Sequence, residues 1–226
     1  MVLPGATTPR QDHDGETGMK SSTTAAALTV AVLGAGGSVT AATLDRGSEA
    51  GATGGRHVAT MRLADGRAVG TVRMQADRDG TRVSVVLRMP DDLAAAGDTF
   101  HGFHVHANAD PANGTGCVAD PTAAPSTWFV SADGHYSQPG ATHGDHAGDL
   151  PVVYVQEDGE SRATFVTDRF TPADVAGRAV IVHAMPDNYA NVPASQYTPT
   201  SPAATDLTAR TGNAGDRVAC GVISGG

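Results

Sequence analysis

Residues 57–89 read HVATMRLADGRAVGTVRMQADRDGTRVSVVLRM, and this stretch decides the fold class. Apolar and polar residues alternate there in short runs, which is the pattern of β-strands with one buried face. The runs are broken by ADG and DRDG, which contain residues that favour hairpin turns. The stretch therefore predicts antiparallel strands joined by hairpins.

Further strands are expected in five later segments, which read FHGFHVHA, VVYVQ, RATFVT, RAVIVHA and RVACGVI. No stretch keeps a helical period for long. The pattern predicts an all-β domain over residues 57–226, an antiparallel Greek-key barrel or sandwich of about eight strands. Two long irregular segments, residues 108–151 and 187–215, interrupt it. Loops of that length in a compact domain are usually functional.

The N-terminal part carries a different pattern. Residues 19–43 read MKSSTTAAALTVAVLGAGGSVTAAT, in which a lysine precedes an apolar run and then small residues. This layout predicts a secretory signal peptide within an extension over residues 1–42, cleaved near Ala41 or Ala42. A low-complexity tail is the alternative. Residues 43–56 are expected to be a flexible linker. The apolar run is too short to span a bilayer, so we expect an exported protein, secreted or retained in the cell envelope or periplasmic space.

Composition and charge limit the classes of protein to which this chain can belong. The 226 residues are 40% hydrophobic and 17% charged, which is ordinary for a soluble globular chain. The formal charge of -9 excludes a general nucleic-acid binder. Cys117 and Cys220 are the two cysteines of the chain. In an exported protein such a pair predicts one disulfide, although two buried free thiols are the alternative.

Histidines are concentrated in one part of the chain. Seven of the nine lie between His101 and His183. Alternate side chains of a strand share a face, so His104 and His106 should point the same way and His101 the other way. Two imidazoles on one face form half of a metal site. Two buried histidines that are satisfied by hydrogen bonds are the alternative.

The remaining histidines occur in two motifs. DGHYSQPGATHGDHAGDLP adds His135, His143 and His146, with Asp149 three residues after the last of them. VIVHAMPD adds His183 at the end of an apolar strand. Six histidines and a carboxylate could fill two adjacent metal sites if one histidine were shared.

These motifs resemble those of a known family, the copper/zinc superoxide dismutases of the exported bacterial type. The matching stretches are GFHVH, the GC of residues 116–117, GHY, HG and GDLP in the long loop, VIVHA and GNAGDRVACGVI. The resemblance covers residues 57–226. It implies an enzyme that converts superoxide, a small anion, to oxygen and hydrogen peroxide by alternate reduction and oxidation of a histidine-bound copper. It implies copper and zinc as cofactors and, because family members are often dimers, a homodimer.

The resemblance also implies a role for individual residues. The copper ligands would be His104, His106, His135 and His183. The zinc ligands would be His135, which bridges the two metals, with His143, His146 and Asp149. Arg217 would guide and bind superoxide, and His135 would leave copper and take a proton during the cycle. His101 and Asp187 would brace the ligands by hydrogen bonds, and Cys117 and Cys220 would form the disulfide.

The chain departs from the family pattern in two places. Only two residues separate His143 from His146, a shorter spacing than is typical. Residues 188–211 are nearly neutral, with Asp206 and Arg210 as their charged residues, where many relatives carry a charged loop that steers the substrate.

Two other functions compete with the enzyme. A copper-binding or copper-delivery module on the same scaffold tends to lose a copper ligand or the guiding arginine, and this chain keeps them all. A structural or adhesion β-sandwich fits the fold class but gives no reason for the histidines.

Overall fold

The computed structural model describes residues 55–90, 98–193, 195–198 and 201–225. The expected signal peptide and nearly all of the expected linker lie outside these residues. Within the described ranges, no helix has the length and apolar character needed to cross a membrane.

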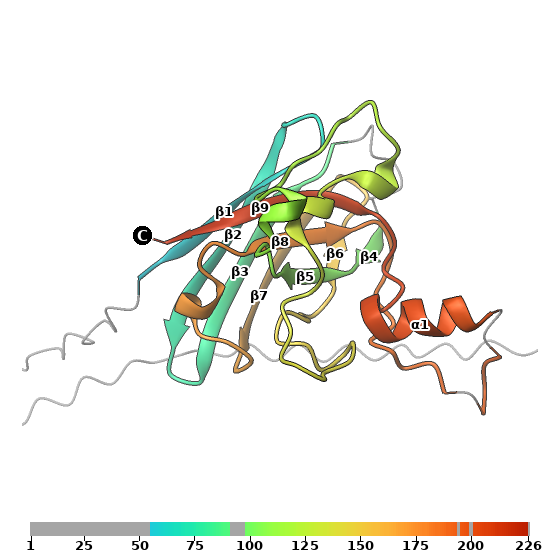
Figure 1. Cartoon of the computed structure of the whole chain (residues 1–226). Coiled ribbons are helices and arrows are strands. Elements are labelled where there is room, and N and C mark those ends of the chain that lie inside the picture. Colours follow the sequence, from blue (N-terminus) through green and yellow to red (C-terminus); the bar gives the residue numbers. More distant parts are fainter. Residues whose placement is uncertain (1–54, 91–97, 194, 199–200, 226) are drawn as a thin grey trace, which may run out of the picture. The chain divides into compact units, whose positions relative to one another are not determined.

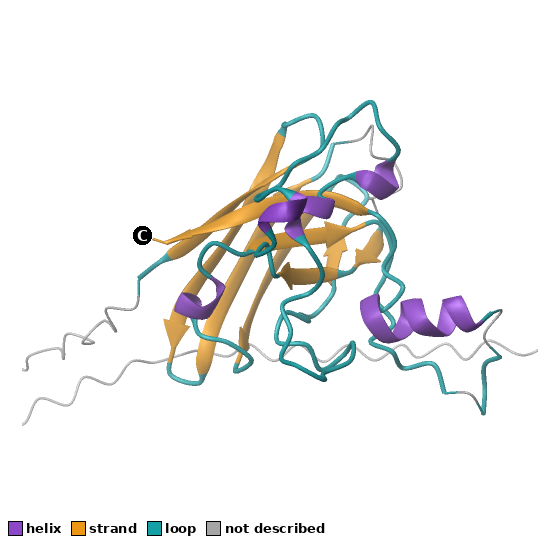
Figure 2. Ribbon diagram, in the orientation of Figure 1, coloured by secondary structure: helices purple, strands orange, loops and turns teal. Residues whose placement is uncertain are grey.

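The described residues form nine strands, four 3-10 helices and one α-helix (Figures 1 and 2). The strands are β1 (His57–Arg62), β2 (Ala68–Asp77), β3 (Gly80–Arg88), β4 (Thr99–His101), β5 (Phe103–His106), β6 (Val153–Val155), β7 (Glu160–Thr167), β8 (Ala179–His183) and β9 (Arg217–Gly225). The helices are η2 (Pro111–Asn113), η3 (Pro125–Thr127), η4 (Val130–Ala132), η5 (Pro172–Val175) and α1 (Pro202–Thr211).

Seven strands form one curled antiparallel sheet in the order β5-β8-β9-β1-β2-β3-β7, and β4 pairs with β6 in a second, two-stranded sheet. The hairpins predicted from residues 57–89 are confirmed, because β1 pairs with β2 and β2 with β3, all antiparallel. The all-β fold class is confirmed with them. The segment FHGFHVHA makes two strands rather than one, because the chain leaves β4 at Gly102 and enters β5 in a different sheet.

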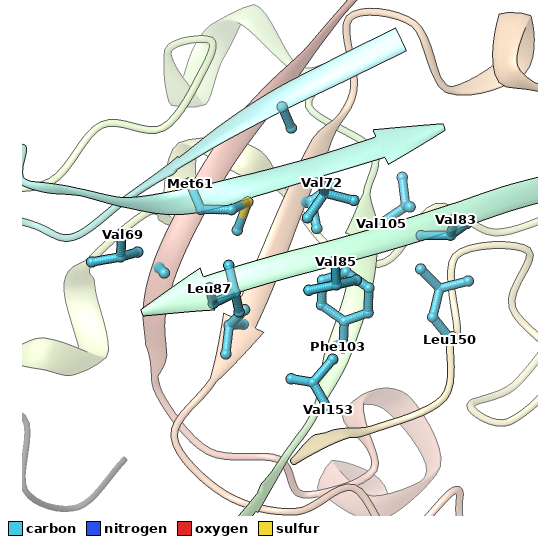
Figure 3. Close-up of a cluster of buried hydrophobic side chains, with 14 of the residues drawn as sticks. Met61, Val69, Val72, Val83, Val85, Leu87, Phe103, Val105, Leu150 and Val153 are labelled. Carbon is cyan, nitrogen blue, oxygen red and sulfur yellow. The ribbon is translucent and has the colours of Figure 1, made fainter. Parts of the chain in front are cut away.

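Alternation along the strands builds the core. In β3 the inward residues Thr81, Val83, Val85 and Leu87 are at most 1% exposed. They face apolar side chains from β1, β2 and β5, among them Phe103 (Figure 3). Each such side chain contributes about 1.5–3 kcal/mol when it is fully buried. The core therefore fixes β5, the strand that carries two of the histidines.

The second long segment is not wholly irregular, contrary to the prediction. It contains α1, which begins after the N-cap Ser201, whose side chain accepts a hydrogen bond from the backbone N–H of Ala204. It ends at Gly212 in the left-handed conformation. No residue of α1 is buried, so the helix carries no apolar stripe that a periodicity search could find. Capping residues alone were the available signal.

The first long segment, residues 108–151, contains η2, η3 and η4 and is closed onto the sheet by a disulfide. Cys117 is bonded to Cys220 of β9, with a Cα–Cα distance of 5.5 Å. The predicted disulfide is therefore confirmed.

Candidate metal centre

Backbone contacts bring the long first segment against the end of the sheet. Isolated β-bridges join His104 to Asp149 and His106 to His135. The segment also approaches β5 closely at Gly148, where an added Cβ would lie 2.1 Å from the carbonyl oxygen of Val105. Glycine is required at this contact, since any larger residue would push the segment away from β5.

The first cluster contains four histidines whose ring nitrogens converge. One nitrogen from each lies within 4.8 Å of the others, and the four residues are His104, His106, His135 and His183. Nε2 of His106 lies 3.4 Å from Nε2 of His183. Nδ1 of His104 and Nε2 of His135 are buried and have no hydrogen-bond partner among the described residues. Buried polar atoms normally have a partner, so these nitrogens fit a metal ion.

The nitrogens on the far side of these rings are all engaged. Nε2 of His104 donates to Asp187 Oδ2 at 2.6 Å. Nδ1 of His106 donates to the carbonyl of Asp133 at 2.8 Å, and Nδ1 of His183 donates to the carbonyl of Gly215 at 3.1 Å. Because the outer nitrogens of His104, His106 and His183 carry the proton, their inner nitrogens are left as lone-pair donors.

The second cluster surrounds the carboxylate of Asp149. Its Oδ1 lies 2.8 Å from Nδ1 of His135, 3.2 Å from Nδ1 of His143 and 3.4 Å from Nδ1 of His146. His104 also lies within 4.8 Å of this group. We assign His146 to it instead, since Nδ1 of His146 is 3.3 Å from that of His135 and Nδ1 of His104 belongs to the first cluster. Three imidazoles and one carboxylate suit zinc.

The short spacing between His143 and His146 is compatible with this geometry. The backbone N–H groups of Gly144 and His146 donate to Asp149 Oδ2 at 2.7 and 3.1 Å. These hydrogen bonds fold the turn around the carboxylate, so both histidines can face it.

Asp187 joins the two clusters. Its carboxylate accepts from Nε2 of His143 at 2.8 Å as well as from Nε2 of His104. Burial opposes ionisation of Asp187, but these hydrogen bonds hold its pKa well below the ordinary value. Burial would likewise lower the pKa of His143, yet Asp149 and Asp187 raise it to about 9.

Three of the four histidines in the first cluster are kept neutral by their surroundings. Burial, aided by repulsion from neighbouring cationic groups, holds the pKa of His106 and of His183 well below the ordinary value. Burial also lowers the pKa of His135 to about 4. Metal ligation needs neutral imidazole, and the site supplies it.

Arg217 stands at the start of β9 beside the first cluster. Its Nη1 donates to the carbonyl of Phe129, and its Nη2 donates to that of Asp133 at 2.6 Å. Desolvation lowers the pKa of Arg217, but from a starting value so high that the guanidinium stays charged. It lines a pocket of about 720 Å³ together with His106, His135 and His183.

The remaining predicted residue, His101, is fully buried, and its Nδ1 donates to the carbonyl of His183 at 2.7 Å. The structure thus brings all the predicted site residues into one region. Sequence reasoning missed three others, namely Phe129, Asp133 and Arg169. Nη1 and Nη2 of Arg169 donate to the carbonyls of His146 and Gly144 at 2.7 and 2.8 Å. No ligand pattern marks these residues, because Phe129 and Asp133 contact Arg217 through their backbone carbonyls and Arg169 contacts the carbonyls of another segment.

Known proteins resemble this chain in sequence and in fold. The family model of copper/zinc superoxide dismutase matches residues 68–223. A Superoxide dismutase [Cu-Zn] of Mycolicibacterium paratuberculosis is 36% identical over 173 residues, covering 74% of this chain and 73% of the relative. One from Deinococcus radiodurans is 31% identical over 171 residues, covering 70% of this chain and 78% of the relative.

Among solved structures, the Cu/Zn superoxide dismutase from Brucella abortus is similar with a TM-score of 0.55 and 26% identity. The match covers 75% of this chain and 99% of that one. The family model spans more than half of the chain, and both relatives are more than 30% identical to it, with over two thirds of each sequence covered. The chain therefore belongs to the copper/zinc superoxide dismutase family.

Proposed function

We propose which residues of this superoxide dismutase, a copper- and zinc-dependent oxidoreductase, carry out each part of its reaction. In this proposal copper would be held by His104, His106, His135 and His183. The observation that carries this assignment is the pair of buried, unpartnered nitrogens, Nδ1 of His104 and Nε2 of His135, that face the Nε2 atoms of His106 and His183. Bound copper supplies the one-electron oxidation and reduction that turn superoxide into oxygen and hydrogen peroxide, chemistry that zinc cannot supply.

Arg217 binds the substrate anion in this proposal. Its guanidinium is held by two carbonyls and lines the same pocket as the copper ligands. A fixed positive charge in a partly desolvated pocket attracts a small anion and orients it toward the histidines.

His135 moves the proton. Its Nδ1 faces Asp149 at 2.8 Å, while its Nε2 faces the copper cluster. Nε2 is therefore the atom that takes up a proton when it is not a ligand and releases it toward the departing product. Zinc, bound by His135, His143, His146 and Asp149, would keep Nδ1 occupied and hold the first long segment in place.

The copper assignment is tested by His106→Ala. The variant should lose dismutase activity in protein reconstituted with both metals, because one of four ligands is gone. His57→Ala is the matched control, since His57 is also buried but lies on β1 outside both clusters. Circular dichroism should show a folded sheet in both variants. Near-normal activity of copper-loaded His106→Ala would overturn the assignment.

We also infer that the enzyme works outside the cytoplasm, secreted or in the cell envelope. The Cys117–Cys220 disulfide and the bacterial relatives are consistent with export. Cell fractionation of a strain that produces the full chain tests this localisation.

The family resemblance also leads us to propose that the protein is a homodimer. Sedimentation of the metal-loaded protein at several concentrations would test this oligomeric state.

A further inference from the structure

The short helix η4 is bracketed by two residues with unusual backbone conformations. Phe129 before it has φ 57° and ψ 20°, and Asp133 after it has φ 63° and ψ -159°. Phe129 is in the left-handed helical region. Asp133 is in a region that is essentially reserved for glycine. A residue with a side chain stays there only if its surroundings hold it.

The side chain of Asp133 provides that hold. Its Oδ2 accepts the backbone N–H of Ala109 at 2.6 Å and that of Asp110 at 2.9 Å. Its Oδ1 accepts the side-chain amide of Asn113 at 2.8 Å. Three donors from residues 20 and more positions away along the chain thus anchor one carboxylate. Hydrogen bonds to a charged acceptor are stronger than those between neutral groups, so the anchor can oppose the strain of the backbone.

The anchored peptide directs one carbonyl at two functional groups. The Asp133 carbonyl oxygen accepts from Nδ1 of His106 at 2.8 Å and from Nη2 of Arg217 at 2.6 Å. The Phe129 carbonyl accepts from Nη1 of the same guanidinium. The two strained residues therefore supply both acceptors of Arg217, and one of them also supplies the acceptor of a copper ligand.

We propose that Asp133 is a positioning residue whose carboxylate holds the peptide in the orientation that aims its carbonyl at His106 and Arg217 together. The proposal rests on the function proposed above, in which His106 binds copper and Arg217 binds the substrate anion. If the carbonyl turned away, Nδ1 of His106 would lose the acceptor that sets its tautomer, and the guanidinium would lose one of its two acceptors. A single side chain outside both metal clusters would then tune the ligand and the anion site at once.

Three substitutions separate the anchor from the backbone it holds. Asp133→Ala removes the anchor and keeps a Cβ in the strained conformation. Asp133→Gly removes the anchor but lets the backbone adopt this conformation freely. Asn113→Ala removes one of the three donors and leaves Asp133 itself intact. Asp120→Ala is the matched control, because it removes a carboxylate of the same segment that accepts from the backbone N–H of Thr122 and takes no part in the anchor of Asp133.

Each variant is reconstituted with copper and zinc and compared with the wild type in three measurements. The Cu(II) electron paramagnetic resonance spectrum reports the geometry of the ligands. Titration with azide reports the anion site, and kcat/KM for superoxide reports turnover. Asp133→Ala should change the spectrum, weaken azide binding and lower kcat/KM by on the order of tenfold, less than the roughly 10²-fold that a displacement of 1 Å can cost.

The variants should differ from one another in the size of their effect. Asp133→Gly should be affected less than Asp133→Ala, Asn113→Ala should shift all three readouts slightly in the same direction, and Asp120→Ala should match the wild type. An Asp133→Ala protein with the wild-type spectrum and azide affinity would overturn the proposal, as would equal damage from Ala and Gly. If the Ala variant does not fold, the Gly and Asn113 variants decide the question by the same spectrum and titration.

Failure of the proposed function would look different. In that case the wild type and Asp120→Ala would themselves lack copper-dependent activity. Failure of the Asp133 proposal alone would leave both of them fully active, with the Asp133 variants indistinguishable from them.

Discussion

At the scale of single residues, the proposed function requires one side chain to present a positive charge to an anion, although the protein as a whole is negative. The chain has a formal charge of -9, so the pocket needs a local cation. Arg217 is the cation that we propose for this role, and the carbonyls of Phe129 and Asp133 both hold its guanidinium in the pocket. The charge is thus placed by hydrogen bonds as well as by sequence position.

Reversing this charge should be costly. Arg217→Glu is expected to lower kcat/KM for superoxide by on the order of 10²-fold, the scale of removing one well-placed electrostatic contact. Arg217→Lys keeps the charge but loses the planar guanidinium that donates to two carbonyls. Its kcat/KM should therefore lie between those of Arg217→Glu and the wild type. The rate of each is measured over a range of ionic strength. An unchanged rate for Arg217→Glu at low salt would show that another group guides the anion.

At the scale of elements, the turn between His143 and His146 depends on a residue outside its own segment. Arg169 follows β7 and donates to the carbonyls of Gly144 and His146. The guanidinium of Arg169 thereby binds carbonyl groups of the turn, while the carboxylate of Asp149 accepts from its backbone N–H groups. This arrangement lets both histidines face Asp149 although only two residues separate them.

Removing the guanidinium of Arg169 should weaken zinc binding more than copper binding. Arg169→Ala is expected to weaken zinc binding by about 10–100-fold, the range for losing a group that orients a ligand. His143→Ala should lose the zinc altogether, and Arg162→Ala, an exposed arginine on β7, should keep it. Competition with a zinc chelator and elemental analysis measure this. Copper content should remain that of the wild type. Unchanged zinc retention in Arg169→Ala would contradict a role of Arg169 in zinc binding.

The helix α1 contributes an ion pair to the mouth of the pocket. Arg210 Nη2 lies 2.9 Å from Asp206 Oδ2, and both side chains are largely exposed. Both line the pocket that contains Arg217. An exposed pair adds little stability, and its two charges nearly cancel for an approaching anion. This agrees with the nearly neutral composition of residues 188–211.

Unpairing the two charges should change the rate in opposite directions. Asp206→Ala leaves Arg210 as a free cation and is expected to raise kcat/KM by about twofold at low ionic strength, whereas Arg210→Ala should lower it by a similar factor. Both differences should vanish in high salt, because exposed charges are screened over about 10 Å at 0.1 M. Stopped-flow kinetics at two salt concentrations measure this. Changes of the same sign in both variants would mean that α1 acts by shape and not by charge.

At the scale of the whole molecule, the disulfide links the sheet to the pocket. Cys220 lies in β9 three residues after Arg217, and Cys117 lies beside Val118, whose carbonyl accepts from the backbone N–H of Phe129 at 2.9 Å. Phe129 in turn holds the guanidinium. The cross-link joins residues 103 positions apart, so it also restricts the unfolded chain strongly.

Loss of the disulfide should therefore lower both stability and activity. The double variant Cys117→Ala with Cys220→Ala is expected to unfold with a free energy about 2–5 kcal/mol smaller than that of the oxidised wild type. Urea denaturation of the metal-free proteins measures this without the contribution of bound metal. Azide binding to the copper-loaded variant should weaken as well. Equal midpoints and slopes for the two proteins would show that packing alone holds the first long segment.

Local pattern was enough to predict the sheet. Residues 57–89 alternate with a period of two and turn at ADG and DRDG, and these features depend on neighbours in sequence alone. The histidine motifs and the cysteine pair could also be recognised, because metal ligands and cross-links must be particular residue types. The helix α1 could not, since none of its residues is buried and burial is what produces a periodic signal.

Only the tertiary structure decided how the site is held. Asp187 reaches His104 across 83 positions, and the order of strands in the sheet makes that meeting possible. Phe129 and Asp133 offer their backbone carbonyls to Arg217, and Arg169 donates to the carbonyls of a distant turn, so residue type alone reveals none of these three contacts. Residue types therefore determined the chemistry of this protein, whereas contacts between distant parts of the chain determined the geometry in which that chemistry is placed.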